Sequence, residues 1–446
     1  IIQYGNDVFV KISGYSREDL IGAPHNIIRH PDMPKIVFKL LWETIKSNKM
    51  IAAYVKNMAS DGSFYWVLAV VFPVKGQYLS VRLKPSTVYR TAAEEIYKQV
   101  LAEEKMNGVE ASGELLFKLL SGAGFATYEQ FFAKALVSEI SARDQFLFKK
   151  ETEKYNAFKQ TNASSGFEYA IQQISNQAFE AIHSNREMFL HLDEFESSTK
   201  KFKDNTNALL DSFMQFQLLS LNMRVYAAQI GQEGASLAVV AQNFQELVSS
   251  IQAYLQKFST DADILSGHIQ NFTIMISSLK LLIDIVDFFI QESLNQIATQ
   301  SGDKKEAFRE LQIHSELFTY LSDQFVEEFK KVKSLAEESV NQFDMANRDI
   351  RKFVNGIELV SQITSVESTR LSDGGKDFKH DIESMIKFSE SLRQSAAVIS
   401  SAAKDLSTNL NKYDSGILLA EKSMKSIFKV ALNLDNTGSP YSKGLV

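Results

Sequence analysis

The chain has 446 residues, of which 45% are hydrophobic and 23% charged, and a formal net charge of −6. This composition is typical of a globular protein of two or three domains, and the negative charge gives no basic surface for nucleic acid. The absence of cysteine excludes disulfides and thiolate chemistry and agrees with a cytoplasmic location.

The prolines divide the chain into two regions. Five lie between Pro24 and Pro85 and the sixth is Pro440, so residues 86–439 contain none. A proline inside a helix removes a hydrogen bond and costs about 3 kcal/mol. A proline-free run of this length therefore predicts a mostly helical region, with a boundary near residue 88.

The first ninety residues predict a small α+β fold. Four strands are expected at 1–4, 52–55, 64–74 and 77–83, with a turn at Ser60–Asp61–Gly62–Ser63. Asp-Gly between apolar runs is a strong hairpin signal. Short helices are expected at 8–12, 16–20 and 33–46, and Asp32 or Asn26 is the expected cap of the last one. The result is a sheet with helices on one side.

Several short motifs in this region carry a family signature. They are NDVFVKISGY at 6–15, HNIIRHPDMP at 25–34, Lys56-Asn57, YWV at 65–67 and SVRLKPS at 80–86. Together they closely resemble the PAS domain of bacterial aerotaxis receptors, over about residues 1–106.

This resemblance implies a cofactor. In that family the PAS domain holds FAD and reports redox state, which implies flavin-binding roles for Arg29, His30 and Asp32. Trp42 and Asn57 match two further family positions near the cofactor. Another ligand such as haem, or an empty signalling domain with His30 as a structural histidine, is the alternative. The sequence has no phosphate loop or His-Glu-x-x-His motif, so we expect no enzyme activity.

The remainder of the chain predicts helices at 87–106, 114–120 and 128–160, the first ending at Asn107–Gly108. We therefore predict three parts: a PAS sensor domain at 1–88, connector helices at 89–165 and a helical bundle at 166–446. The apolar run Ile274–Ile290 is interrupted by three charges, so we interpret it as a bundle helix and not as a membrane span. A heptad-like seam supports the bundle; its residues are Phe308, Leu311, Phe318, Leu321, Phe325, Phe329, Val332 and Leu335.

Two stretches of the bundle resemble the signalling hairpin of methyl-accepting chemotaxis proteins. The first is Leu218–Ala241, and the second, Val366–Phe378, matches it at a shift of 141 residues. With tips near 232 and 373 and a turn at 301–303, four arms of similar length predict a long antiparallel four-helix bundle. Because chemoreceptors build such a bundle from two subunits, we interpret this one as an intramolecular pseudo-dimer.

The resemblance also implies partners for the two tips. In the family, polar tip residues contact the chemotaxis histidine kinase, its coupling protein and other chemoreceptors. The first tip keeps such a residue at Asn222, and the second tip keeps two, Glu367 and Arg370. We therefore expect cytoplasmic sensory transduction, with contact or dimerisation through the PAS domain as a further expectation. The alternative is a structural or adaptor protein of the chemosensory array whose PAS domain binds no ligand.

Overall fold

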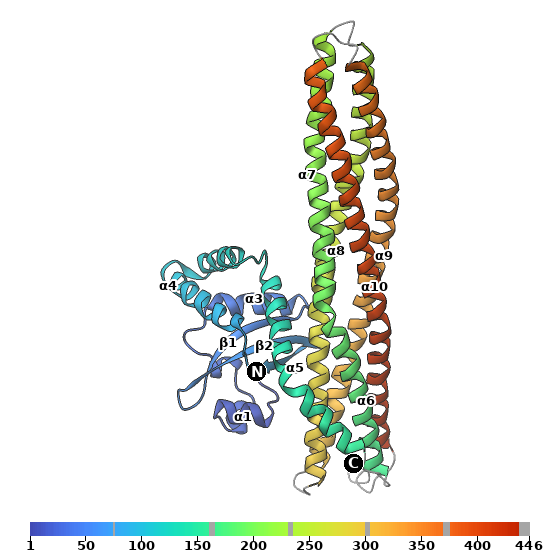
Figure 1. Ribbon diagram of the computed structural model, residues 1–446. Coiled ribbons are helices and arrows are strands. Elements are labelled where there is room, and N and C mark those ends of the chain that lie inside the picture. Colours follow the sequence, from blue (N-terminus) through green and yellow to red (C-terminus); the bar gives the residue numbers. More distant parts are fainter. Residues whose placement is uncertain (75, 160–165, 231–234, 299–303, 369–374, 437–446) are drawn as a thin grey trace. The chain divides into compact units, whose positions relative to one another are not determined.

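The computed structural model describes residues 1–74, 76–159, 166–230, 235–298, 304–368 and 375–436 (Figure 1). The chain divides into two compact units, Ile1–Gln172 and Gln173–Val446. The predicted division into three parts, with boundaries near 88 and 165, stays a prediction.

The first unit contains a three-stranded antiparallel sheet in the order β1-β2-β3. The strands are β1 (Ile51–Met58), β2 (Phe64–Val74) and β3 (Gln77–Leu83). The last two have the predicted bounds, and β1 extends its prediction at both ends. In the turn before β2, Gly62 has a φ of +83° and the Asp61 carboxylate accepts the Ser63 N–H at 2.9 Å. The predicted hairpin is therefore confirmed.

The predicted strand at 1–4 is wrong. Ile2 makes only two backbone hydrogen bonds, both 2.8 Å long, with Gly22 and Ala23. These partners belong to a loop, so no ladder can extend along the segment. The short helices are confirmed as α1 (Asp7–Ser13) and α2 (Arg17–Leu20), and a further 3₁₀ turn, η1 (His25–Ile28), precedes α3 (Lys35–Lys46).

The predicted cap of α3 is also wrong. The helix begins after Pro34, which makes no side-chain cap, and Asp32 binds the Lys56 ammonium instead. The acceptor at this end comes from far along the chain, because the Glu104 carboxylate accepts the Ile36 N–H at 3.2 Å.

The short helices α1, η1 and α3 contact one face of the sheet, as expected for the first ninety residues, and two long helices from the following region cover the other face. These are α4 (Val88–Gly122) and α5 (Tyr128–Lys159). Tyr97 of α4 stacks on Trp66 with ring centroids 6.4 Å apart. The predicted helix end at Gly108 is a bend, since that residue is non-helical (φ 92°, ψ 177°) inside α4.

The second unit is a bundle of long helices: α6 (Gly166–Leu190), whose first turns belong to the first unit, α7 (Leu192–Ile230), α8 (Ala235–Ala298), α9 (Lys304–Ser368) and α10 (Gly375–Asn436). From α7 onward each helix contacts the next, and α10 returns to contact α7. Gln217 pairs with Gln252, and farther from the tip Lys203 pairs with Asp263. The residue numbers fall along α7 while they rise along α8, so the two helices are antiparallel. The four-helix bundle is therefore confirmed, with α6 extending the α7 arm; its three predicted turns lie outside the described residues.

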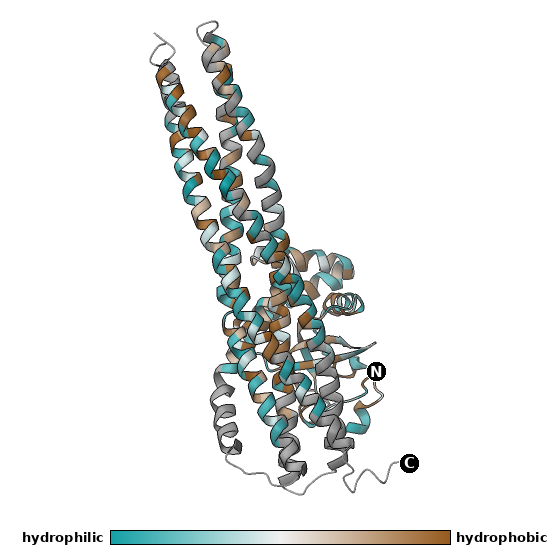
Figure 2. Cartoon of the chain, turned by 90° about the vertical axis from the view of Figure 1, so that its right-hand side faces the viewer, coloured by the Kyte–Doolittle hydropathy of each residue, from teal (hydrophilic) through white to brown (hydrophobic). Residues whose placement is uncertain are grey.

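The bundle core repeats along the chain. Residues separated by 141 positions (350 − 209) are buried in pairs, and Phe272 meets its equivalent Tyr413 edge to face, with ring centroids 5.1 Å apart. In Figure 2, hydrophobic and hydrophilic positions alternate along these helices. The buried pairs are Leu209 with Ile350, Phe213 with Val354, Ala262 with Ala403, Leu265 with Leu406, Ile269 with Leu410, Phe272 with Tyr413, and Ile276 with Ile417.

The predicted apolar segments contribute buried residues to the bundle core. In the heptad-like seam, Phe325, Phe329 and Val332 are buried, while the side chains of its earlier residues lie outside the described ones. In the apolar run of α8, Lys280 is buried and pairs with Asp284 at 2.6 Å, so the two charges satisfy each other. No helix in the described ranges is long and apolar enough to cross a membrane.

Candidate ligand-binding site

The face of the sheet that lies against α1, η1 and α3 is called the inner face below. In the antiparallel register Asn57 lies opposite Tyr65, and Ala69 of the same β2 face lies opposite Arg82. Directly opposed residues share a sheet face, and alternate residues of one strand do too. Asn57, Tyr65 and Arg82 therefore all belong to the inner face.

These three side chains carry buried polar atoms. Asn57 is 2% exposed, and its Nδ2, the Tyr65 hydroxyl and Arg82 Nη1 are buried as well. Burial raises the pKa of the Tyr65 phenol, and the charge of Arg82 and side-chain hydrogen bonds from Asn57 and Arg82 partly offset this. Buried polar groups are nearly always hydrogen-bonded in proteins. These three polar groups face one another on one side of the sheet and are therefore a candidate ligand site.

Arg82 makes its contacts with groups that carry no negative charge. Its Nη2 lies 3.1 Å from Nε2 of His25, and its guanidinium lies 4.9 Å from the ring centroid of Phe9. Although His25 is exposed as a residue, desolvation of its ring and the charge of Arg82 lower the pKa of His25 to about 4. The imidazole is therefore neutral near pH 7 and accepts the bond from Arg82.

The Arg29–His30–Asp32 motif forms a second cluster, beside the edge of β1. A backbone bridge joins Arg29 to Asn57, and the Asp32 carboxylate binds the Lys56 ammonium at 2.7 Å. The His30 Nδ1 accepts the Asp32 N–H at 3.1 Å. Arg29 donates to the Met33 carbonyl at 3.3 Å, and its guanidinium lies 4.0 Å from the ring centroid of Phe38.

The other predicted site residues are separated from this cluster. Asn57 joins Tyr65 and Arg82 on the inner face, as described above. Trp42 is 44% exposed, and its ring meets that of Tyr78 with centroids 5.6 Å apart. The structure thus brings Arg29, His30 and Asp32 together, and leaves their role in flavin binding as a prediction.

Sequence reasoning missed His25, Tyr65 and Arg82 as site residues, although all three lie in the quoted motifs. No local signal marked Arg82, because it alternates with Tyr78 and Ser80 while the apolar Leu79, Val81 and Leu83 occupy the other register of the strand. Only the pairing of Arg82 with Ala69 places it on the inner face.

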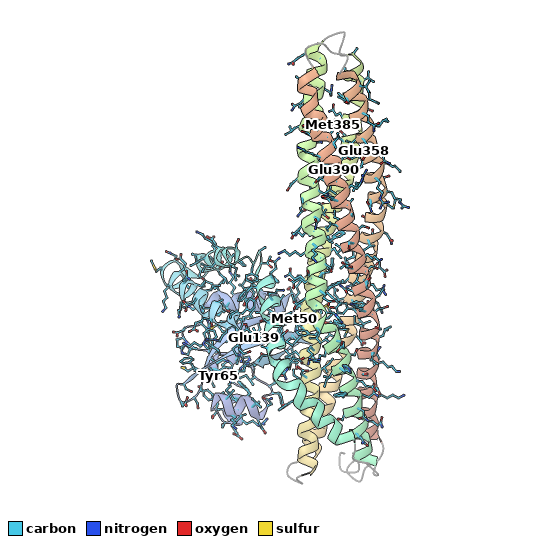
Figure 3. All side chains as sticks on the ribbon, viewed as in Figure 1. Met50, Tyr65, Glu139, Glu358, Met385 and Glu390 are labelled. Carbon is cyan, nitrogen blue, oxygen red and sulfur yellow. The ribbon has the colours of Figure 1, made fainter. Side chains whose placement is uncertain are left out.

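A buried carboxylate on α5 was also missed. Glu139 is 2% exposed, and Figure 3 labels it on α5, beside the sheet. It accepts the hydroxyls of Tyr54, Ser86 and Thr87 at 2.9, 3.0 and 2.8 Å, and the N–H groups of Ser86 and Thr87 at 2.7 and 3.2 Å. Thr87 is the N-cap of α4. Glu139 therefore joins β1, α5 and the start of α4.

The predicted tip residues are only partly described. Asn222 lies on α7 and is exposed. The side chain of Glu367, in the last turn of α9, and the whole of Arg370 lie outside the described residues. In the part of the chain that the structure describes, no group of three or more His, Asp or Glu side chains is placed to hold a metal ion.

Comparisons with known proteins identify the fold family of the N-terminal residues. Residues 2–81 match the family model of the PAS fold. The aerotaxis receptor of Escherichia coli (strain K12) is 39% identical over 106 residues, which is 23% of this chain and 21% of the receptor. The chain thus spans about a fifth of the length of the curated relative that it matches. The N-terminal domain of the chain is therefore a PAS domain similar to that of aerotaxis receptors.

Proposed function

We propose that the chain is a cytoplasmic sensory protein of the chemotaxis and aerotaxis-receptor kind. Its PAS domain senses redox state or a small ligand, and its helical bundle carries the signal. The observation that carries this proposal is the presence, in one chain, of a PAS domain similar to that of an aerotaxis receptor and an antiparallel four-helix bundle. Differential binding of a few kcal/mol is enough to shift a two-state element. No catalytic step is involved.

FAD is the cofactor that we propose. The Asn57 amide, the Tyr65 hydroxyl and Arg82 Nη1 are buried polar groups on one sheet face, and their donors suit the carbonyl oxygens of a flavin ring. Bound flavin would supply the redox chemistry. Arg29, His30 and Asp32 are proposed to contact the cofactor from the edge of β1, where they are held by bonds to Met33 and Lys56; the ring of His30 packs on Phe64, on the sheet face of Trp66. Haem is less well supported, because an axial imidazole would have to give up its hydrogen bond to Arg82 or Asp32.

The route of the signal is proposed to run through α4. This helix begins beside Glu139 and packs Tyr97 on the sheet. Farther along, Glu104 binds the start of α3, and its charge also influences the pKa of Arg29. A change at the ligand site can therefore reach α4 from both faces of the sheet.

The bundle is proposed to be two chemoreceptor-like hairpins in tandem, forming a pseudo-dimer within one chain. The 141-residue repeat of buried positions supports this interpretation. Its tips, through Asn222, Glu367 and Arg370, would contact a chemotaxis histidine kinase, its coupling protein or other chemoreceptors. A dimer formed through the PAS domain is compatible with this arrangement.

The alternative proposal is an adaptor protein of the chemosensory array whose PAS domain stays empty. One observation favours it: the polar groups of Arg29, His30 and Asp32 are bonded within the protein without any ligand.

An absorbance spectrum of the purified full chain, followed by anaerobic reduction with dithionite, separates the two proposals. For a redox sensor we expect visible flavin bands that bleach on reduction. Hydrogen exchange in α4 and in the bundle should differ between the two states. A colourless protein that does not take up added FAD or haem would refute the cofactor proposal and favour the adaptor.

A further inference from the structure

The part of the bundle formed by α6 has a weaker core than the part formed by α7. Its buried side chains are mostly small or polar, whereas α7 buries large apolar ones at the same face of the arm. Burial of apolar surface is the main stabilising contribution in a folded protein. Up to Asn185, the described buried residues of α6 are Ser175, Ala178, Ala181, Ile182 and Asn185, and those of α7 include Phe195, Phe202, Leu209 and Phe213.

Asn185 is the least favourable residue of this face. It is 0% exposed, and both Nδ2 and Oδ1 of its amide are buried without a hydrogen-bond partner in the described part of the chain. The equivalent residue of the repeat (326 − 185 = 141), Val326, is buried and apolar. A buried amide that makes no hydrogen bond has lost its hydration without compensation. The packing of α6 is therefore opposed at Asn185.

Two further features define the movement that α6 can make. It lies beside α10 (Figure 1), where the Ser184 hydroxyl donates to the Gly416 carbonyl at 3.0 Å and a Cβ at Gly416 would lie 2.8 Å from the Met188 side chain. At its other end His191 separates α6 from α7, and the His191 N–H bonds the Met188 carbonyl, three positions back, at 3.2 Å. A bond of this 3₁₀ type between helical segments often marks a hinge.

We propose that α6 is a hinged coupling helix with two positions. In the position described here it packs on α10, and in the second it turns away about residue 191 and water hydrates the Asn185 amide. The chain passes from the first compact unit to the second inside α6, between Gln172 and Gln173, so any signal carried by the backbone passes through this helix. Elements that move in signalling are drawn from the least stable parts of a structure. This inference goes beyond the proposed function and does not depend on the ligand of the PAS domain.

Hydrogen exchange of the full-length chain, followed by mass spectrometry without added ligand, tests the proposal. We expect the amides of 178–190 to exchange together, at least about tenfold faster than those of 195–213. Asn185→Val gives α6 the residue that the repeat has at Val326. It should slow the exchange of 178–190 by roughly 10 to 100-fold, because the packed position then no longer buries an unbonded amide.

Two other variants give the opposite effect and the matched control. Gly416→Ala should speed the exchange of 178–190 about tenfold, because its Cβ opposes the close approach of Met188. Thr199→Val is the control, because the Thr199 hydroxyl is also buried in this arm but donates to the Phe195 carbonyl at 2.9 Å. We expect Thr199→Val to leave the exchange of 178–190 unchanged.

The outcomes distinguish a hinged α6 from a uniformly packed bundle. Equal protection of 178–190 and 195–213 in the wild type would overturn the proposal. So would fast exchange of 178–190 that Asn185→Val leaves unchanged, because the opening would then have another cause. A slowing that Thr199→Val reproduces would overturn it as well, since it would report on the whole arm. A protein without bound flavin, which refutes the cofactor proposal, changes none of these outcomes.

Discussion

The Glu139 carboxylate accepts a hydrogen bond from the Tyr54 hydroxyl at 2.9 Å, between two residues 85 positions apart in the chain. Both are almost fully buried. The remaining bonds of Glu139 come from Ser86 and Thr87, where β3 passes into α4. All of them are donors, and the N-terminal end of a helix favours negative charge. Among the described residues, the Glu139 carboxylate is thus stabilised by hydrogen-bond donors, and no ion pair to it is present.

Replacing Glu139 should therefore destabilise the PAS unit strongly. In Glu139→Ala, the donors of Tyr54, Ser86 and Thr87 lose their acceptor, and we expect a loss of about 3–4 kcal/mol of unfolding free energy. Glu139→Gln keeps one acceptor oxygen and should lose about half as much. Both tryptophans, Trp42 and Trp66, lie in this unit, so urea unfolding followed by tryptophan fluorescence reports on it selectively.

Glu110→Gln is the matched control. Glu110 is exposed and pairs with Lys39 at 2.6 Å, and such surface pairs contribute at most about 1 kcal/mol. A Glu139→Gln variant no less stable than Glu110→Gln would contradict the structural role of Glu139.

The sequence predicted this fold largely through local patterns. The Asp61–Gly62 turn and the strands beside it depend on neighbouring residues, and so does the heptad spacing through Phe325 and Phe329. Those predictions agree with the structure. The 141-residue repeat also predicted the lengths of the four bundle helices, because the period of the repeat and the expected turns indicate the same helix ends.

The failures concern contacts between distant residues. The Asp32 side chain could cap a helix, but it binds Lys56 instead. The Glu104 carboxylate accepts the hydrogen bond at the start of α3. Similarly, no local pattern shows that Glu139 will meet Tyr54. Asn57 was found through the family resemblance, whereas Tyr65 and Arg82 become site residues only once the strand register is known.

The stability of the PAS unit should fall as the pH drops from about 6.5 to about 4. The folded-state pKa of His25 is about 4, below its unfolded value. The unfolded state therefore binds more protons in this window, and stability rises with pH through it. The lowered pKa of His30 acts in the same direction.

His25→Gln, which cannot be protonated, should flatten this dependence. Because His25 is partly solvated, we expect the difference between pH 7 and pH 4.5 to shrink by only about 1 kcal/mol. Urea titrations of both proteins at the two pH values measure it. An unchanged pH dependence in the variant would show that His25 is not held neutral in the folded state.

Two helical glycines of the bundle should respond in opposite ways to alanine. A Cβ at Gly267 of α8 meets nothing within 4 Å, so Gly267→Ala should stabilise the bundle by about 0.5–1 kcal/mol through helix propensity. At Gly416 of α10 a Cβ would lie 2.8 Å from the Met188 side chain. The Ser184 hydroxyl also donates to the Gly416 carbonyl at 3.0 Å.

Gly416→Ala should therefore force α6 away from α10 and lower the melting temperature, while Gly267→Ala raises it. Thermal unfolding followed by far-UV circular dichroism reports mainly on the bundle, because its helices dominate the signal. Equal shifts of the same sign in the two variants would contradict the close contact at Gly416.

The last prediction concerns the pseudo-symmetric core. Phe272 and Tyr413 occupy equivalent positions and contact each other, but the Tyr413 hydroxyl is buried without a partner. Removing an unsatisfied buried polar group relieves its desolvation cost. Tyr413→Phe should therefore stabilise the bundle by about 1 kcal/mol, whereas Phe272→Tyr, which adds a second such hydroxyl, should destabilise it by a similar amount. Thermal unfolding of the two variants and of the double exchange measures both effects. A stabilising Phe272→Tyr substitution would show that the core at this layer can accommodate polar groups and is not the dry aromatic contact described here.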